Sequence, residues 1–129
     1  MRKIIRGLFA LAFCAMASAP QAGAVTLFST PLVPANGQVP VCSVTNVDTK
    51  PITLTVEVVD ADGATVVPVA NECPVAPATL APRETCFLYA PINARVSCRV
   101  TSSSKKIRAA LNLLNGTTAA LEVQAPATR

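Results

Sequence analysis

Histidine and tryptophan are both missing from the 129 residues of this chain. Its two methionines, Met1 and Met16, lie in an N-terminal segment that we expect to be removed. Without histidine there is no histidine-based catalytic triad, no use of the commonest general base, and no imidazole ligand for zinc or copper. The composition therefore argues against an enzyme and against a bound metal or other cofactor.

Glycine is scarce beyond residue 24, and Gly37, Gly63 and Gly116 form no glycine-rich loop of the kind that cradles phosphate. Two neighbouring carboxylates could catalyse hydrolysis. The candidates for such a pair are Glu57, Asp60, Asp62, Glu72 and Glu84. Asp60 and Asp62 fall in a turn-forming stretch, where aspartate is favoured by turn geometry alone. We therefore expect no catalytic residues.

The first 24 residues have the three parts of a secretory signal peptide. A basic start is followed by an uncharged apolar run at 8–17, which is shorter than the roughly 20 residues that span a bilayer. Ala22-Gly23-Ala24 then offers a small-residue cleavage site. We predict cleavage before Val25, export to the periplasm or the medium, and no transmembrane anchor in the mature chain.

Most of the net positive charge belongs to that leader. Eleven Lys and Arg against seven Asp and Glu give the whole sequence a net charge of +4. Arg2, Lys3 and Arg6 account for three of the basic residues, so eight basic against seven acidic residues, or +1, remain after cleavage. Proteins that bind nucleic acid usually present a clearly cationic face. We therefore expect no nucleic-acid partner.

Residues 25–129 are enough for one domain with a modest core. Their composition, rich in Val, Ala and Pro and poor in aromatics, is typical of strands and turns. Alternating apolar and polar residues predict strands at 25–28 (an edge strand), 39–47, 52–58, 64–69, 84–90 and 94–101. An Asp-Gly pair predicts a hairpin turn at 60–63.

The last segment, residues 105–114, fits two structures. Its apolar residues alternate from Ile107 to Leu113, as in a strand. They also recur at helical spacing, with Ser104 as a possible helix cap. Asn115-Gly116 is a strong hairpin signal, so we favour a strand that turns into a further strand at 118–123, and the helix remains open.

Four cysteines follow the leader, and an even number in a small exported chain indicates disulfides with three possible pairings. Cys42 and Cys98 lie on the apolar faces of their strands, so both should point inward and join two packed sheets. Cys73 lies in a proline-rich loop at 71–83, and Cys86 begins the next strand. We predict the bonds Cys42–Cys98 and Cys73–Cys86. A metal site is disfavoured because the close C-x-x-C spacing of structural zinc is missing.

Seven or eight strands with turns every 8–12 residues indicate a two-sheet immunoglobulin-like β-sandwich. Three stretches carry a resemblance: residues 42–47, the Leu80-Ala81-Pro82 turn, and 98–101 leading into 104–109. In these the chain resembles small exported bacterial immunoglobulin-like domains of unknown function. It departs from antibody-type members, since Val96 stands where those have a corner tyrosine. The resemblance implies an architecture and no particular activity, because one superfold hosts many functions.

Four basic side chains form a candidate binding patch: Arg95, Arg99, Lys106 and Arg108. If their strands are neighbours, their outward side chains could meet an acidic partner, an anionic polysaccharide or lipid head groups. The alternative is a solvated strand face whose charges block aggregation.

These observations favour a non-catalytic interaction or structural module of the periplasm or cell exterior, with a protein or an envelope polymer as its partner. The alternative function is inhibition of an exported hydrolase. In that case the loop 71–83, stapled by Cys73–Cys86, would enter the cleft of the enzyme, because a preorganised loop lowers the entropic cost of binding.

Overall fold

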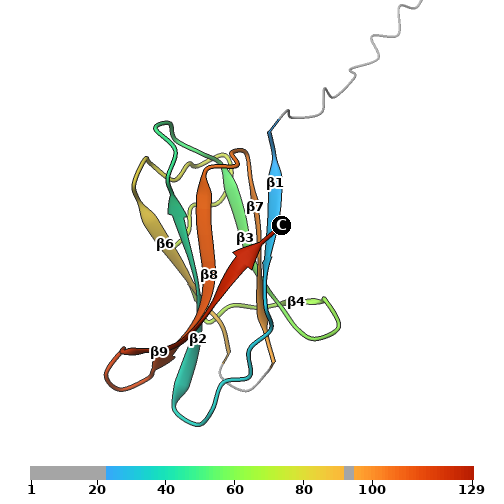
Figure 1. Cartoon of the computed structure of the whole chain (residues 1–129), viewed down its shortest axis with the longest axis vertical. Helices are drawn as coiled ribbons and strands as arrows, with labels where there is room; N and C mark the ends of the chain where they lie inside the picture. Colours follow the sequence, from blue (N-terminus) through green and yellow to red (C-terminus); the bar gives the residue numbers. More distant parts are fainter. Residues whose placement is uncertain (1–22, 92–94) are drawn as a thin grey trace, which may run out of the picture.

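The structure, a computed structural model, describes residues 23–91 and 95–129 (Figure 1). Residues 1–22 of the predicted signal peptide lie outside the described residues. Every regular element in the described part is a β-strand, which confirms the predicted all-β fold. The described residues contain no helix long and apolar enough to cross a membrane.

The described residues form nine strands, where the sequence predicted seven or eight. Two of the nine, β4 and β5, contain only two residues each. The strands are β1 (Val25–Ser29), β2 (Gln38–Asn46), β3 (Leu54–Val59), β4 (Thr65–Val66), β5 (Ala70–Asn71), β6 (Thr85–Tyr89), β7 (Ser97–Ser102), β8 (Ile107–Asn115) and β9 (Leu121–Thr128). The short strands lie at the two edges of the sheet, where they leave little backbone open for unwanted pairing.

The strands form one antiparallel sheet with the order β4-β3-β7-β1-β9-β8-β2-β6-β5, which curls into a half-barrel (Figure 1). β1 joins the two halves of the sheet, because it pairs with β7 over Val25–Phe28 and with β9 at Phe28 and Ser29. The predicted edge position of the first strand is therefore wrong. The last strand continues to Thr128 and pairs with the end of β1, at Phe28 and Ser29, on the side that was expected to be open.

The ambiguous segment 105–114 forms the strand β8, which confirms the favoured prediction. Its nine residues pair with β2 from Asn46↔Ile107 to Gln38↔Asn115. The helix propensity of Ala and Leu is a weak preference, and pairing on both sides of β8 outweighs it.

The turn after β8 differs from the predicted Asn-Gly turn. The loop runs over 116–120, and Asn115 Oδ1 accepts hydrogen bonds from the backbone amides of Thr117 and Thr118 at 2.9 and 3.0 Å. The residue with positive φ is Ala119. Gly116 is needed for close approach, since a Cβ there would lie 2.8 Å from the carbonyl oxygen of Gly37.

The disulfide Cys42–Cys98 crosses the interior and joins β2 to β7, with 5.8 Å between the Cα atoms. Both cysteines are fully buried, as are Val44 and Val100 beside them. This confirms the predicted pairing and the inward direction of both side chains.

The disulfide Cys73–Cys86, also as predicted, ties the chain between β5 and β6 to the start of β6. The same segment reaches the other side of the half-barrel, where Leu80 and Ile52 exchange backbone hydrogen bonds of 2.8 and 3.1 Å. Residues 72–84 therefore connect the two edges of the curled sheet.

A fully buried asparagine fixes that connection. Asn46 Nδ2 donates to the carbonyl oxygens of Lys50 and Leu80 at 2.9 and 3.0 Å, and Asn46 Oδ1 accepts from the Asp48 amide at 2.8 Å. A buried amide with all three partners in place holds the loop after β2 and the segment near Leu80 together.

We expect loss of the Cys42–Cys98 bond, in Cys42→Ala with Cys98→Ala, to lower the free energy of unfolding by about 4 kcal/mol. Loss of Cys73–Cys86 should cost about 3 kcal/mol, because stabilisation grows with the loop that a bond closes in the unfolded chain. The partners are 56 and 13 residues apart in sequence. Urea unfolding followed by far-ultraviolet circular dichroism measures both losses, and a larger loss for the second bond would contradict the expectation.

Asn46→Ala should cost about 2–3 kcal/mol, because it leaves the Lys50 and Leu80 carbonyls without their donor. Asn36→Ala, at an exposed loop position, is the matched control and should change the free energy of unfolding by less than about 0.5 kcal/mol. Thermal and urea unfolding of both variants give the comparison. Equal stability of the two would show that the buried amide does not hold the connection.

Candidate functional site

The candidate site lies where β9 parts from β8. β9 pairs with β8 as far as Pro126, and then Ala127 and Thr128 pair with β1. The first residues of β8, Ile107–Ala109, consequently pair with β2 alone. A groove of about 440 Å³ opens at this fork. The side chains that give it its chemistry are Ser43, Thr45, Arg108, Ala110, Gln124 and Pro126, and we call it the fork groove.

A chain of side-chain hydrogen bonds crosses three strands beside the groove. Gln124 Nε2 donates to Asn112 Oδ1 at 2.9 Å, and Asn112 Nδ2 donates to Ser43 Oγ at 2.8 Å. Ser43 Oγ in turn donates to the carbonyl oxygen of Ala110 at 3.5 Å. Asn112 is only 8% exposed although it lies on the outer face of the sheet. The bonds fix the orientation of both amides before any ligand arrives.

Gln124 keeps hydrogen-bonding capacity toward the solvent. A side-chain amide has two N–H donors and one carbonyl acceptor. In the part of the chain that the structure describes, Gln124 uses one N–H and no donor reaches its carbonyl oxygen. Gln124 therefore presents an acceptor and a donor side by side at the groove.

A cation and two hydroxyls lie side by side across β8, β2 and β6, next to the chain of amides. Arg108 is paired in register with Thr45, and Thr45 with Thr85 on β6. The two threonine hydroxyls are hydrogen-bonded at 2.8 Å. Arg108 is exposed and has no ion pair within residues 23–91 and 95–129. Its guanidinium is therefore available to an anionic ligand.

An aromatic surface borders the groove on the side of β6. Phe87 is paired with Ser43 in register, and Tyr89 with Val41, so both aromatic side chains belong to the face that carries the groove. Phe87 is 36% exposed and Tyr89 is half-buried. One continuous outer face thus carries amides and hydroxyls, one cation and two aromatic rings.

The structure does not assemble the basic patch predicted from sequence. The patch required the strands of Arg99 and Arg108 to be neighbours, but β1 and β9 separate β7 from β8. Arg99 instead forms an ion pair with Glu57, with Nε and Oε2 2.7 Å apart. Lys106 Nζ lies 3.8 Å from Asp48 Oδ1. Arg95 is exposed ahead of β7, which leaves Arg108 as the one member that lines the fork groove.

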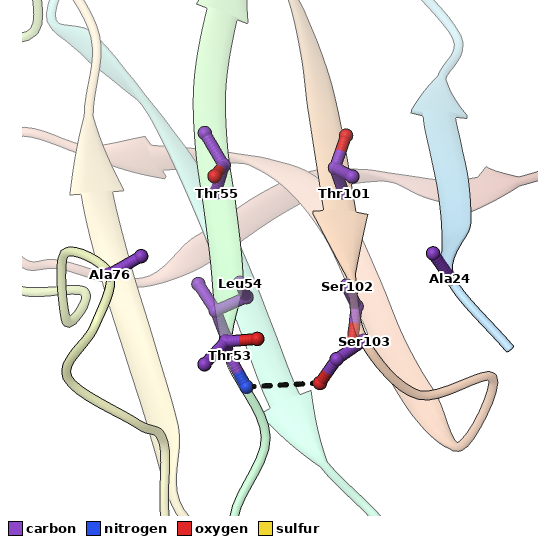
Figure 2. A pocket seen from close by; sticks show the side chains of 8 residues that line it. All are labelled: Ala24, Thr53, Leu54, Thr55, Ala76, Thr101, Ser102 and Ser103. Carbon is purple, nitrogen blue, oxygen red and sulfur yellow. Dashed lines mark hydrogen bonds between the residues drawn. The ribbon is translucent and has the colours of Figure 1, made fainter. Parts of the chain in front are cut away.

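A second, smaller pocket of about 140 Å³ lies on the outer face of the other half of the sheet. Figure 2 shows that short side chains surround it, among them Thr53, Thr55, Thr101 and Ser103. Its marked hydrogen bond runs from the Thr53 amide to Ser103 Oγ at 3.1 Å (Figure 2). Hydroxyl groups line this pocket, but no charged or aromatic side chain does. It therefore offers a ligand fewer kinds of interaction than the fork groove.

Three of the carboxylates considered for hydrolysis, Glu57, Asp60 and Glu84, have structural partners. Asp60 Oδ1 accepts hydrogen bonds from the amides of Asp62 and Ala64, both at 2.9 Å, and Gly63 has positive φ, so the turn interpretation is confirmed. The Arg99 guanidinium beside Glu57 holds the pKa of that carboxyl below its usual range. Across residues 23–91 and 95–129 there is no group of three or more Asp, Glu, Cys or His side chains placed to hold a metal ion.

Arg108 is a candidate binding residue from the sequence alone, whereas Asn112 and Gln124 are not. One signal was available for Asn112, which is a polar residue in the middle of the apolar run of β8. No comparable signal marked Gln124, because its place beside Asn112 depends on the register of β9 against β8.

No protein-family model, no curated protein and no solved structure matches this chain. Its function therefore has to be inferred from the fork groove and from the chemistry of the side chains around it.

The ion pair between Arg99 and Glu57 predicts a loss of stability in acid. The pKa of Glu57 is lowered from 4.5 in the folded chain, so the pair stabilises the fold above that pH. The stabilisation is lost as the pH falls through the lower, folded pKa. We expect Glu57→Gln to be less stable than wild type at neutral pH, and the difference to shrink as the pH falls below 4.5 and through the lower, folded pKa.

Urea unfolding across that pH range measures the difference. Glu72→Gln removes an exposed carboxylate that forms no ion pair in the described residues, so it serves as the control. A Glu57→Gln difference that stayed constant with pH, or that Glu72→Gln reproduced, would contradict the assignment.

Proposed function

We propose that this chain is an exported, non-catalytic binding module of the periplasm or cell exterior. In this proposal residues 1–24 are a cleaved signal peptide, and residues 25–129 are a single immunoglobulin-like domain. The two disulfides support export, because such bonds persist in oxidising compartments. The position of Cys42–Cys98, which spans the interior between the two halves of the sheet, supports the comparison with a two-sheet sandwich.

The fork groove is the observation that carries the binding role. Its polar groups sit on paired strands and are held by one another, so they lose little conformational freedom when a ligand binds. They are amide, hydroxyl and guanidinium groups, which do not gain or lose protons readily near neutral pH. Such groups orient a ligand through hydrogen bonds and are poorly suited to proton transfer.

A second candidate function is inhibition of an exported hydrolase by the loop 71–83. The loop is stapled by Cys73–Cys86 and presents Val75, which is 71% exposed. An apolar side chain on a constrained loop is a reasonable anchor for the cleft of an enzyme. The same loop also connects the two edges of the sheet through Leu80 and Ile52, so its rigidity has a structural use as well.

Photo-cross-linking from three positions distinguishes these functions. A benzoylphenylalanine replaces Phe87 beside the fork groove, Phe28 on the outer face of the other half of the sheet, or Val75 on the loop. Phe28 is 49% exposed and is the matched control. The full chain is expressed in its native host and irradiated, and adducts in the exported fraction are identified by mass spectrometry.

We expect adducts from position 87 and none from position 28. Adducts from position 75 alone would favour the inhibitor. Adducts from position 28 alone, or from none of the three positions, would overturn a binding role for the groove face.

A further inference from the structure

We infer that the fork groove binds an acidic oligosaccharide, with Arg108 holding a sugar carboxylate and with Gln124, oriented by Asn112, holding the hydroxyls. This inference rests on the proposed binding function and names the chemical class of the partner. Three features of the outer face point to that class: paired amides, a free cation and an exposed aromatic border.

The amides suit the hydroxyl groups of a sugar. A sugar hydroxyl is both a donor and an acceptor, so adjacent hydroxyls are well bound by a group that offers a carbonyl oxygen and an N–H together. Gln124 offers both beside the groove, and its bond to Asn112 fixes their direction. Asn112 is buried and spends its hydrogen bonds on Ser43 and Gln124, so its role is to orient Gln124 toward the groove.

Arg108 supplies the charge selectivity. A guanidinium binds a carboxylate with two parallel hydrogen bonds, and such charge-assisted bonds are stronger than neutral ones. Arg108 has no acidic neighbour in register, since Thr45 stands opposite it on β2, and it forms no ion pair among the described residues. One unpaired cation beside neutral amides fits a polymer with a carboxylate on a hydroxyl-rich ring better than a polyphosphate backbone, which needs many cations.

The aromatic border extends the surface beyond one ring. β9, β8, β2 and β6 are consecutive in the sheet, so Phe87 lies three strand spacings from β9, roughly 14 Å. Ser43 and Ala110 have short side chains between these two ends and leave the floor low. A chain of several sugar rings can lie across this floor, with the apolar face of one ring against Phe87.

An extended peptide is the main rival occupant. Peptides that add to a sheet are bound through main-chain hydrogen bonds and through pockets for alternate side chains. Such binding would use the open side of Ile107–Ala109 and would depend little on the side chains of Gln124 and Arg108. The two occupants therefore respond differently to side-chain substitutions.

Titration of the oxidised protein with three tetrasaccharides that contain uronic acid tests the inference: those of galacturonate, alginate and hyaluronan. Binding is followed by calorimetry and by nuclear magnetic resonance of the backbone and side-chain amides. We expect at least one tetramer to bind and to shift the side-chain amide signals of Asn112 and Gln124. Arg108→Gln should weaken binding about tenfold, and Gln124→Ala should weaken it as well.

The methyl ester of the tetramer that binds is the neutral control. Esterification should weaken binding to wild type by about the same factor as Arg108→Gln. In the Arg108→Gln variant, esterification should weaken binding little further, because both changes remove the same contact between the guanidinium and the carboxylate. Gln124→Ala should weaken binding of the acid and of the ester alike. Arg95→Gln removes the same charge from an exposed position outside the groove and should leave affinity unchanged.

Absence of binding by all three tetramers would overturn the inference, as would equal losses for Arg95→Gln and Arg108→Gln. If position 87 still cross-linked to a protein in the exported fraction, the proposed binding function would stand and only the ligand class would fail. If no tetramer bound and position 87 gave no adduct, both would fail.

Discussion

The bond between Cys42 and Cys98 constrains more of this molecule than any other interaction. Along the sheet, three strands separate the two that it joins, so the bond crosses the interior and holds the curl of the sheet. It also fixes which residues face outward. With Cys42 pointing inward, Ser43 must point outward, and the register then places Ala110 and Asn112 on the same face. A slip of one residue would turn these side chains into the core.

The rest of the structure compensates for a small core. Val, Ala and Leu provide most of the buried side chains, and a core of this size leaves a modest margin of stability. The second disulfide and the buried Asn46 hold residues 72–84 against both edges of the half-barrel. Covered and very short edge strands also reduce the open backbone that could pair with another chain.

The fork groove arises because β9 changes partner. After Pro126 it leaves β8 for β1, which closes the middle of the sheet and opens one side of β8 at the same time. The split exposes Arg108 beside a row of amides and hydroxyls that the neighbouring strands align. The same change of partner thus joins the two halves of the fold and creates a polar groove.

The sequence by itself determined what depends on local spacing. Alternation identified most of the long strands and turned Cys42 and Cys98 inward, and the Asp60–Gly63 stretch specified its own turn. Only the tertiary structure decided which strands are neighbours. Period-two patterns report the face of a side chain and not the strand beside it, so the central place of β1 and the pairing of Arg99 with Glu57 could not be inferred. The contact between Gln124 and Asn112 could not be inferred either, because the register of β9 against β8 is set by long-range pairing.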